Sequence, residues 1–172
     1  MRCRSGELYV ADTENARIVV FNGGRKVKET IKAPQSTVIP EGFLFKPIAV
    51  AVDKTDRIYV VSRNNLMGIM AITPPGQFDG FIGVPKVIVN PIDLIWRVFM
   101  TKEQIDRTTK LIPTEFNNIT VDAEGFIFAT VKSIDNAAQY AAIKSRSKSS
   151  DFAPVKKLNP SGVDVLTRNG FF

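Results

Sequence analysis

Short apolar runs with no polar side recur along this chain. Residues 8–11 read Leu-Tyr-Val-Ala, so apolar side chains would point to both faces of an extended strand, and residues 48–52 contain no polar residue. Runs of this length, bounded by turn residues, are typical of strands whose two faces are both covered. The pattern therefore predicts short strands in sheets that pack between neighbouring sheets.

The runs repeat with equivalent residues. Tyr9, Tyr59 and Phe128 occupy matching positions, and the second and third of them follow an aspartate, Asp53 or Asp122, at the same spacing. An aspartate at such a position can accept a hydrogen bond from the backbone two residues further on, which forms a tight turn. Each unit therefore predicts a strand, an aspartate-led turn, a second strand and a further hairpin.

Three such units are expected. The first covers residues 6–32 and is incomplete, because it begins at the position of the second strand in the other two units. The second covers residues 46–83 and is expected to contain four strands. The third covers residues 113–168 and carries an inserted loop at 133–153, whose alanines, serines and short basic cluster favour a solvated surface segment.

A helical insert is predicted between the second and third units, over residues 90–112. Asn90 can cap a helix, Pro91 suits the first helical position, and a capping-box pattern begins at Thr101. The apolar residues of the first half share one helical face, which includes Trp96. We expect this face to pack the insert onto the sheets rather than to bind a ligand.

These elements predict an all-β fold: a partial β-propeller of about three four-stranded antiparallel blades, with the short helical insert between the second and third blades. Neighbouring blades cover each other's faces, as the apolar strands require. A two-sheet sandwich is the alternative, but it exposes one face of every strand and favours alternation of polar and apolar residues. The whole chain, residues 1–172, is expected to form one such partial domain.

Composition restricts the chemistry. The chain has no histidine and one cysteine, Cys3, which excludes mechanisms that need imidazole, internal disulfides and cysteine-rich zinc sites. The formal net charge of +6 is spread over both halves of the chain, so we expect no nucleic-acid partner. We also expect no membrane span and no signal peptide, because no apolar run is long enough and residues 1–7 lack an apolar core.

The turn after Tyr9 resembles an NHL repeat, a β-propeller repeat with an Asp-Thr/Ser-x-Asn-x-Arg-Ile/Val core. The first unit contains this core in full: Asp12 and Thr13 are followed by Asn15, Arg17 and Ile18. The first unit is therefore the strongest basis for the resemblance.

The other two units match this core less well. The second keeps Asn65 but has Ser62 and Met67 in place of the aspartate and the arginine, and the third keeps only its aspartate-led turn and strand, residues 121–128. The helical insert and the following residues 112–118 are also similar to a subgroup of bacterial NHL-repeat proteins thought to act outside the cytoplasm.

The resemblance implies a propeller of about six blades that generally serves as a binding scaffold. At roughly 40–50 residues per blade, the chain supplies about three blades. We therefore expect an arc that belongs to a larger propeller, or one that completes its ring with another copy by self-association through open blade faces.

Propeller ligands usually bind at one end of the central channel, where loops lead into the innermost strands. Lys46 precedes the expected innermost strand of the second unit, and Glu115, Asn117 and Asn118 precede that of the third. These four residues are the candidate ligand-binding residues. The alternative is that the two asparagines shape a turn and Glu115 is solvated.

The leading hypothesis is a non-enzymatic binding or scaffold module for a protein or carbohydrate partner, since the chain contains no complete catalytic set. The alternative is a fragment of a metal-dependent lactonase-like hydrolase of the gluconolactonase type. Such relatives hold a divalent metal with Glu, Asn and Asp from separate blades, and Ca²⁺ accepts these oxygen ligands. No other cofactor is expected.

Overall fold

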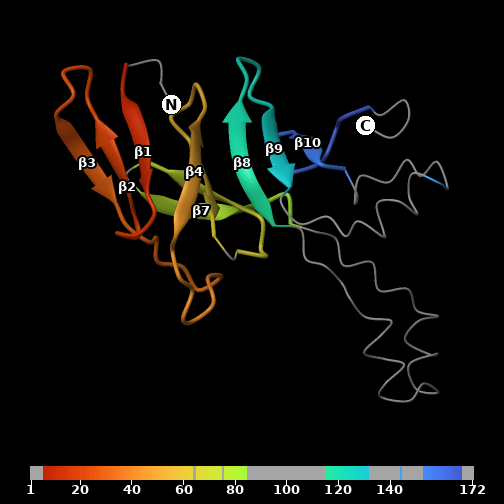
Figure 1. The fold of residues 1–172 in the computed structure, drawn as a ribbon, viewed down its shortest axis with the longest axis horizontal. Coiled ribbons are helices and arrows are strands. Elements are labelled where there is room, and N and C mark those ends of the chain that lie inside the picture. Colours follow the sequence, from red (N-terminus) through yellow and green to blue (C-terminus); the bar gives the residue numbers. More distant parts are fainter. Residues whose placement is uncertain are drawn as a thin grey trace.

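The computed structural model describes residues 6–63, 65–74, 76–84, 115–131, 144 and 153–167, which form ten strands in three antiparallel sheets (Figure 1). The all-β prediction is confirmed. The helical insert expected at 90–112 lies outside the described residues, as does nearly all of the loop expected at 133–153. The strands are β1 (Leu8–Asp12), β2 (Arg17–Phe21), β3 (Val27–Ile31), β4 (Pro47–Val52), β5 (Ile58–Ser62), β6 (Ile69–Thr73), β7 (Gln77–Ile82), β8 (Phe116–Val121), β9 (Ile127–Val131) and β10 (Val155–Leu158).

Each sheet is a simple meander in which every strand pairs with the next one along the chain. The first sheet has the order β1-β2-β3, the second β4-β5-β6-β7, and the third β8-β9-β10. The third sheet also begins a further strand, because residue 164 forms an isolated bridge with Leu158 and the Val165 N–H donates to the Lys157 carbonyl at 2.8 Å. The second unit thus contains the four strands that its sequence predicts.

Aspartate and asparagine side chains close the tight turns between strands. Asp53 Oδ1 accepts hydrogen bonds from the backbone N–H groups of Thr55 at 2.7 Å and Arg57 at 3.1 Å. Asp122 Oδ1 accepts equivalent bonds two and four residues further on, both at 2.9 Å. These bonds satisfy backbone donors inside the turn, so the predicted turn-forming role of both aspartates is confirmed.

The β1–β2 turn is closed by the residues that carry the family resemblance. The Asp12 carboxylate accepts hydrogen bonds from Asn15 Nδ2 at 2.8 and 3.0 Å and from Arg17 Nε at 2.8 Å. The Arg17 hydrogen bond, supported by that of Asn15, lowers the pKa of Asp12 below its usual value. Ala16 has a φ of 52°, a left-handed conformation that the surrounding bonds hold in place. The side chains of the motif therefore stabilise the conformation of this turn through hydrogen bonds.

The second sheet is buried on both faces. Toward the first sheet it packs Ile58, Val60, Met70 and Ile72 against a core that includes Tyr9 and Ile18. The opposite face packs against the third sheet and completes a second core. That core contains Ala51, Tyr59, Val61, Ile69, Ala71, Ile82, Phe116, Ile119, Ile127, Ala129 and Leu158. The two-sided apolar strands of this unit are therefore covered twice, as their sequence predicts.

The three sheets stack with the same orientation. β1 contacts β4 just as β5 contacts β8, and β4 also contacts β8, so the three sheets follow one another in chain order (Figure 1). Tyr9 on the first sheet faces the second sheet, and Tyr59 on the second sheet faces the third. Each tyrosine-bearing face therefore covers the next sheet in the series, which leaves one outer face on the first sheet and one on the third.

Candidate functional site

The structure brings two of the predicted site residues to the same end of neighbouring strands. Lys46 directly precedes β4 and Glu115 directly precedes β8, and these two strands lie side by side (Figure 1). We call this end, with the turn of residues 13–16, the loop end. Asn117 and Asn118 differ from expectation, because they lie within β8 rather than before it.

Lys46 takes part in a charged group that the sequence motifs did not indicate. Glu14, from the β1–β2 turn, lies 3.6 Å from Lys46 Nζ and 3.4 Å from Arg63 Nη1. The three side chains are well exposed, so each ion pair contributes at most about 1 kcal/mol. Beside them, Thr13 Oγ1 donates to the Pro47 carbonyl at 2.7 Å. These contacts join the first sheet to the second at the loop end.

The two asparagines use their oxygen atoms inside the third sheet. Asn117 Oδ1 accepts a hydrogen bond from Thr130 Oγ1 on β9, and Asn118 Oδ1 accepts the Ile119 N–H at 2.8 Å. Within the described part of the chain, no three Asp, Glu or Cys side chains cluster so that they could hold a metal ion. The calcium site of the lactonase-like alternative stays a prediction.

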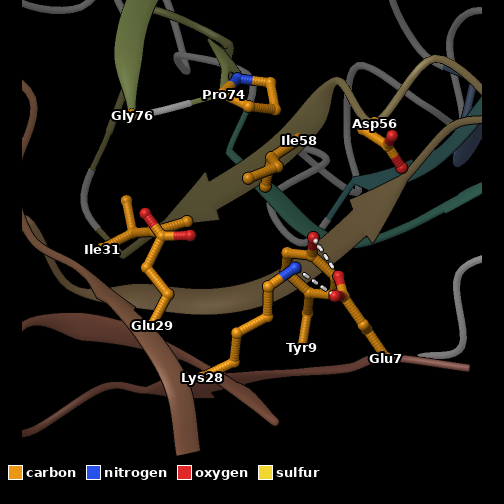
Figure 2. A pocket seen from close by; sticks show the side chains of 9 residues that line it. All are labelled: Glu7, Tyr9, Lys28, Glu29, Ile31, Asp56, Ile58, Pro74 and Gly76. Atoms are coloured by element: carbon orange, nitrogen blue, oxygen red, sulfur yellow. Dashed lines mark hydrogen bonds and ion pairs between the residues drawn. The ribbon is translucent and has the colours of Figure 1, made fainter. Parts of the chain in front are cut away.

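A pocket of about 220 Å³ lies between the first and second sheets (Figure 2). It contains Asp56 of the β4–β5 turn, which follows β4, whereas Lys46 precedes that strand. The pocket is therefore at the end of the sheets opposite the loop end. Its walls are partly apolar and partly charged: Glu7, Tyr9, Lys28, Glu29, Ile31, Asp56, Ile58, Pro74 and Gly76 line it.

Three carboxylates and one ammonium group give this pocket a negative balance. Lys28 Nζ forms an ion pair with Glu7 Oε1, and Tyr9 Oη donates to Glu7 Oε2 at 3.2 Å (Figure 2). The hydrogen bond to Glu7 raises the pKa of Lys28, and the charges of Glu7, Glu29 and Asp56 raise it further. The pocket thus offers carboxylate oxygens beside aliphatic walls, a combination that suits a cationic group on an apolar stem.

Sequence reasoning missed this pocket because its charged residues come from separate segments. Lys28 and Glu29 are adjacent in β3, and strict alternation would place them on opposite faces. The β2–β3 pairing shifts register between Val20 and Phe21, which allows both side chains to line the pocket. A bulge of this kind is set by strand pairing, so no local signal in the sequence marks it.

A second polar group surrounds Tyr59 in the middle sheet. Tyr59 Oη donates to Asp53 Oδ2 at 3.0 Å, and the Arg57 guanidinium lies 5.6 Å from the centroid of the Tyr59 ring. Burial raises the pKa of Asp53, but hydrogen bonds from Thr55, Arg57 and Tyr59 outweigh it and hold this pKa below its usual value. Burial, with the negative charge of Asp53, raises the pKa of Tyr59 to about 12.

We expect this tyrosine to make the fold sensitive to alkali. Because the pKa of Tyr59 is raised to about 12 in the folded chain, the unfolded chain loses the proton first. The contribution of protonated Tyr59 to the free energy of unfolding is complete below about pH 10, the ordinary tyrosine pKa, and is lost as the pH rises toward 12. The loss amounts to about 1–2 kcal/mol. Urea unfolding of the wild type and Tyr59→Phe measures it: the stability difference between them should change over this range. A difference that is independent of pH would contradict the assignment.

Within the described residues, no helix has the length and apolar character needed to cross a bilayer. The search against protein-family models returned no match for this chain, and the search against curated proteins likewise returned no similar protein.

Proposed function

We propose that the chain is part of an NHL-type β-propeller that acts as a non-enzymatic binding module for a protein or carbohydrate partner. The observation that carries the proposal is the repeated stacking of the three sheets. In each contact the face of one sheet that bears the tyrosine covers the face of the next sheet that does not bear its aromatic residue. Tyr9 thus packs on the side of Ile58, and Tyr59 packs on the side of Ile127. Radial packing of blades has this recurrent, single-direction character. The complete Asp12, Asn15 and Arg17 turn supports the assignment to the NHL type.

Within the described residues, the pocket between the first and second sheets is a candidate place for a partner to bind. Its volume of about 220 Å³ suits one side chain or one sugar ring rather than a larger ligand. Because carboxylates outnumber ammonium groups there, we favour a protein partner that inserts a lysine or arginine side chain. The Ile31 and Ile58 walls would contact its methylene groups.

Titration with two probes tests this proposal. A short peptide with one central lysine and neutral flanking residues, and a neutral monosaccharide, are each titrated by NMR chemical shift. We expect the peptide to perturb pocket resonances, and the Glu29→Gln/Asp56→Asn variant to weaken binding about fivefold, because exposed ion pairs contribute up to about 1 kcal/mol. Added salt should weaken peptide binding in the same direction.

Two further variants locate the site. Glu41→Gln removes an exposed carboxylate outside the pocket and should leave peptide affinity unchanged. Glu14→Gln removes a carboxylate of the loop end, the one that pairs with Lys46 and Arg63; if it alone weakens peptide binding, the loop end and not the pocket is the binding surface. Binding of neither probe would contradict the pocket assignment, and preference for the monosaccharide would favour a carbohydrate partner.

A further inference from the structure

The outer face of the first sheet is an apolar surface with a polar margin. Leu8 pairs across the strands with Phe21, which pairs with Val27, and Val10 pairs with Val19, so these five side chains lie on one face of the sheet. Val19 is buried beneath its neighbours, and the others are exposed or partly exposed. Leu8, Val10 and Val27 are 42%, 37% and 60% exposed. The ion pair between Asp12 and Arg17 limits the patch at one end.

Equivalent positions on the other two sheets show what such a face packs against. Leu8 and Val10 correspond to Ile58 and Val60 in the second sheet, which are 2% and 0% exposed because the first sheet covers them. They also correspond to Ile127 and Ala129 in the third sheet, which are fully buried against the second. In both contacts the covering sheet supplies an aromatic residue from the strand that is equivalent in the repeat: Tyr9 from β1 or Tyr59 from β5. The occupant expected for the outer face is therefore another sheet with an aromatic residue there.

Within the described sheets, one uncovered face carries an aromatic residue at this position. On the outer face of the third sheet, Phe128 occupies the position of Tyr9 and Tyr59, and it pairs with Thr120 on one side and Lys157 on the other. Lys157 Nζ lies 5.4 Å from the centroid of the Phe128 ring and 4.0 Å from that of Phe126, both within cation–π range. Val155, 40% exposed, extends the apolar area along β10.

We propose that a second copy of the chain docks the outer face of its third sheet onto the outer face of the first sheet. This contact repeats, between chains, the arrangement that already occurs twice within one chain. It is heterologous, and two copies can close it reciprocally, so that both outer faces of each copy are covered. The proposal rests on the stacking of the sheets and is independent of ligand binding at the acidic pocket. The outer face of the third sheet also carries Asn118, Thr120, Thr130 and Lys157, so this interface is weaker than the internal ones.

Sedimentation velocity on the full chain over the micromolar range tests the proposal. The wild type should show a concentration-dependent dimer. Val10→Asp places a charge on one outer face and Val155→Asp places one on the other, and each variant alone should be monomeric. Mixed together, the two variants retain one intact contact, between the third sheet of the first variant and the first sheet of the second. The mixture should therefore recover a heterodimer.

The controls distinguish this contact from association through a different surface. Val38→Asp changes a valine that is 60% exposed and lies outside both faces, so it should dimerise like the wild type. Far-UV circular dichroism checks that each variant is folded, and Leu8→Lys replaces Val10→Asp if the latter unfolds. A monomeric wild type overturns the proposal. So does a Val155→Asp variant that still dimerises while Val10→Asp does not, because two first sheets would then be packing against each other.

Discussion

Ile58→Asp is expected to unfold the protein. Ile58 is 2% exposed and lies in β5, on the face of the middle sheet that packs against the first sheet. The substitution loses the burial of an isoleucine, about 1.5–3 kcal/mol, and places a buried carboxylate between an aliphatic core and a pocket in which carboxylates outnumber ammonium groups, which costs several kcal/mol more. The sum is comparable to the whole stability of a typical domain, roughly 5–15 kcal/mol. Circular dichroism and urea unfolding measure the loss.

The repeat supplies a matched control for this substitution. Leu8→Asp changes the equivalent residue of the first sheet, which is 42% exposed and faces away from the second sheet. At concentrations where the chain is monomeric, it should cost far less than Ile58→Asp. Equal losses from the two variants would contradict the burial of the second sheet between its neighbours.

Gly68→Ala is expected to destabilise the fold by about 3 kcal/mol, the sum of backbone strain and overpacking. Gly68 has a φ of +103°, which side chains other than hydrogen rarely allow, and a Cβ there would lie 2.5 Å from the Ile82 carbonyl oxygen. That oxygen belongs to the end of β7, whose residue Ile82 pairs with Ile69, so it cannot move without disturbing the pairing. The turn before β6 therefore requires glycine for both conformation and space.

Gly23→Ala is the control for this prediction. A Cβ at Gly23 meets no atom within 4 Å, and the residue is exposed in the β2–β3 turn. Urea unfolding should show a change of less than about 0.5 kcal/mol for this variant, as for most surface substitutions. If Gly68→Ala were equally mild, the close approach between the β6 turn and β7 would be wrong.

Features that depend on near neighbours in the chain could be predicted from the sequence. Asp53 and Asp122 bond to backbone groups two to four residues away, and Asp12 bonds to Asn15 and Arg17 within the same hairpin. The four strands expected in residues 46–83 are likewise present, as β4 to β7. Such contacts are encoded by residue type and spacing, so they require no knowledge of the rest of the fold.

The candidate site was predicted less well because its contacts join distant segments. Sequence position brought Lys46 and Glu115 to the same end of neighbouring strands, but it did not indicate that Glu14 would lie between Lys46 and Arg63. Asn117 and Asn118 were expected before a strand and lie within one, with their oxygens bonded inside the third sheet. Their polar character alone did not distinguish a loop from an exposed strand position.

The sequence by itself determined that the described part of the chain forms β-sheets, where its turns fall and that the strands of its second unit are apolar on both faces, because these properties follow from local spacing and residue type. Only the tertiary structure decided which faces meet and where a cavity remains. The acidic pocket depends on a register shift in β3 and on Asp56 from the second sheet, and the outer face of the first sheet is defined by what packs on its opposite side. Both depend on pairings between segments far apart in the chain, whose geometry no local pattern encodes.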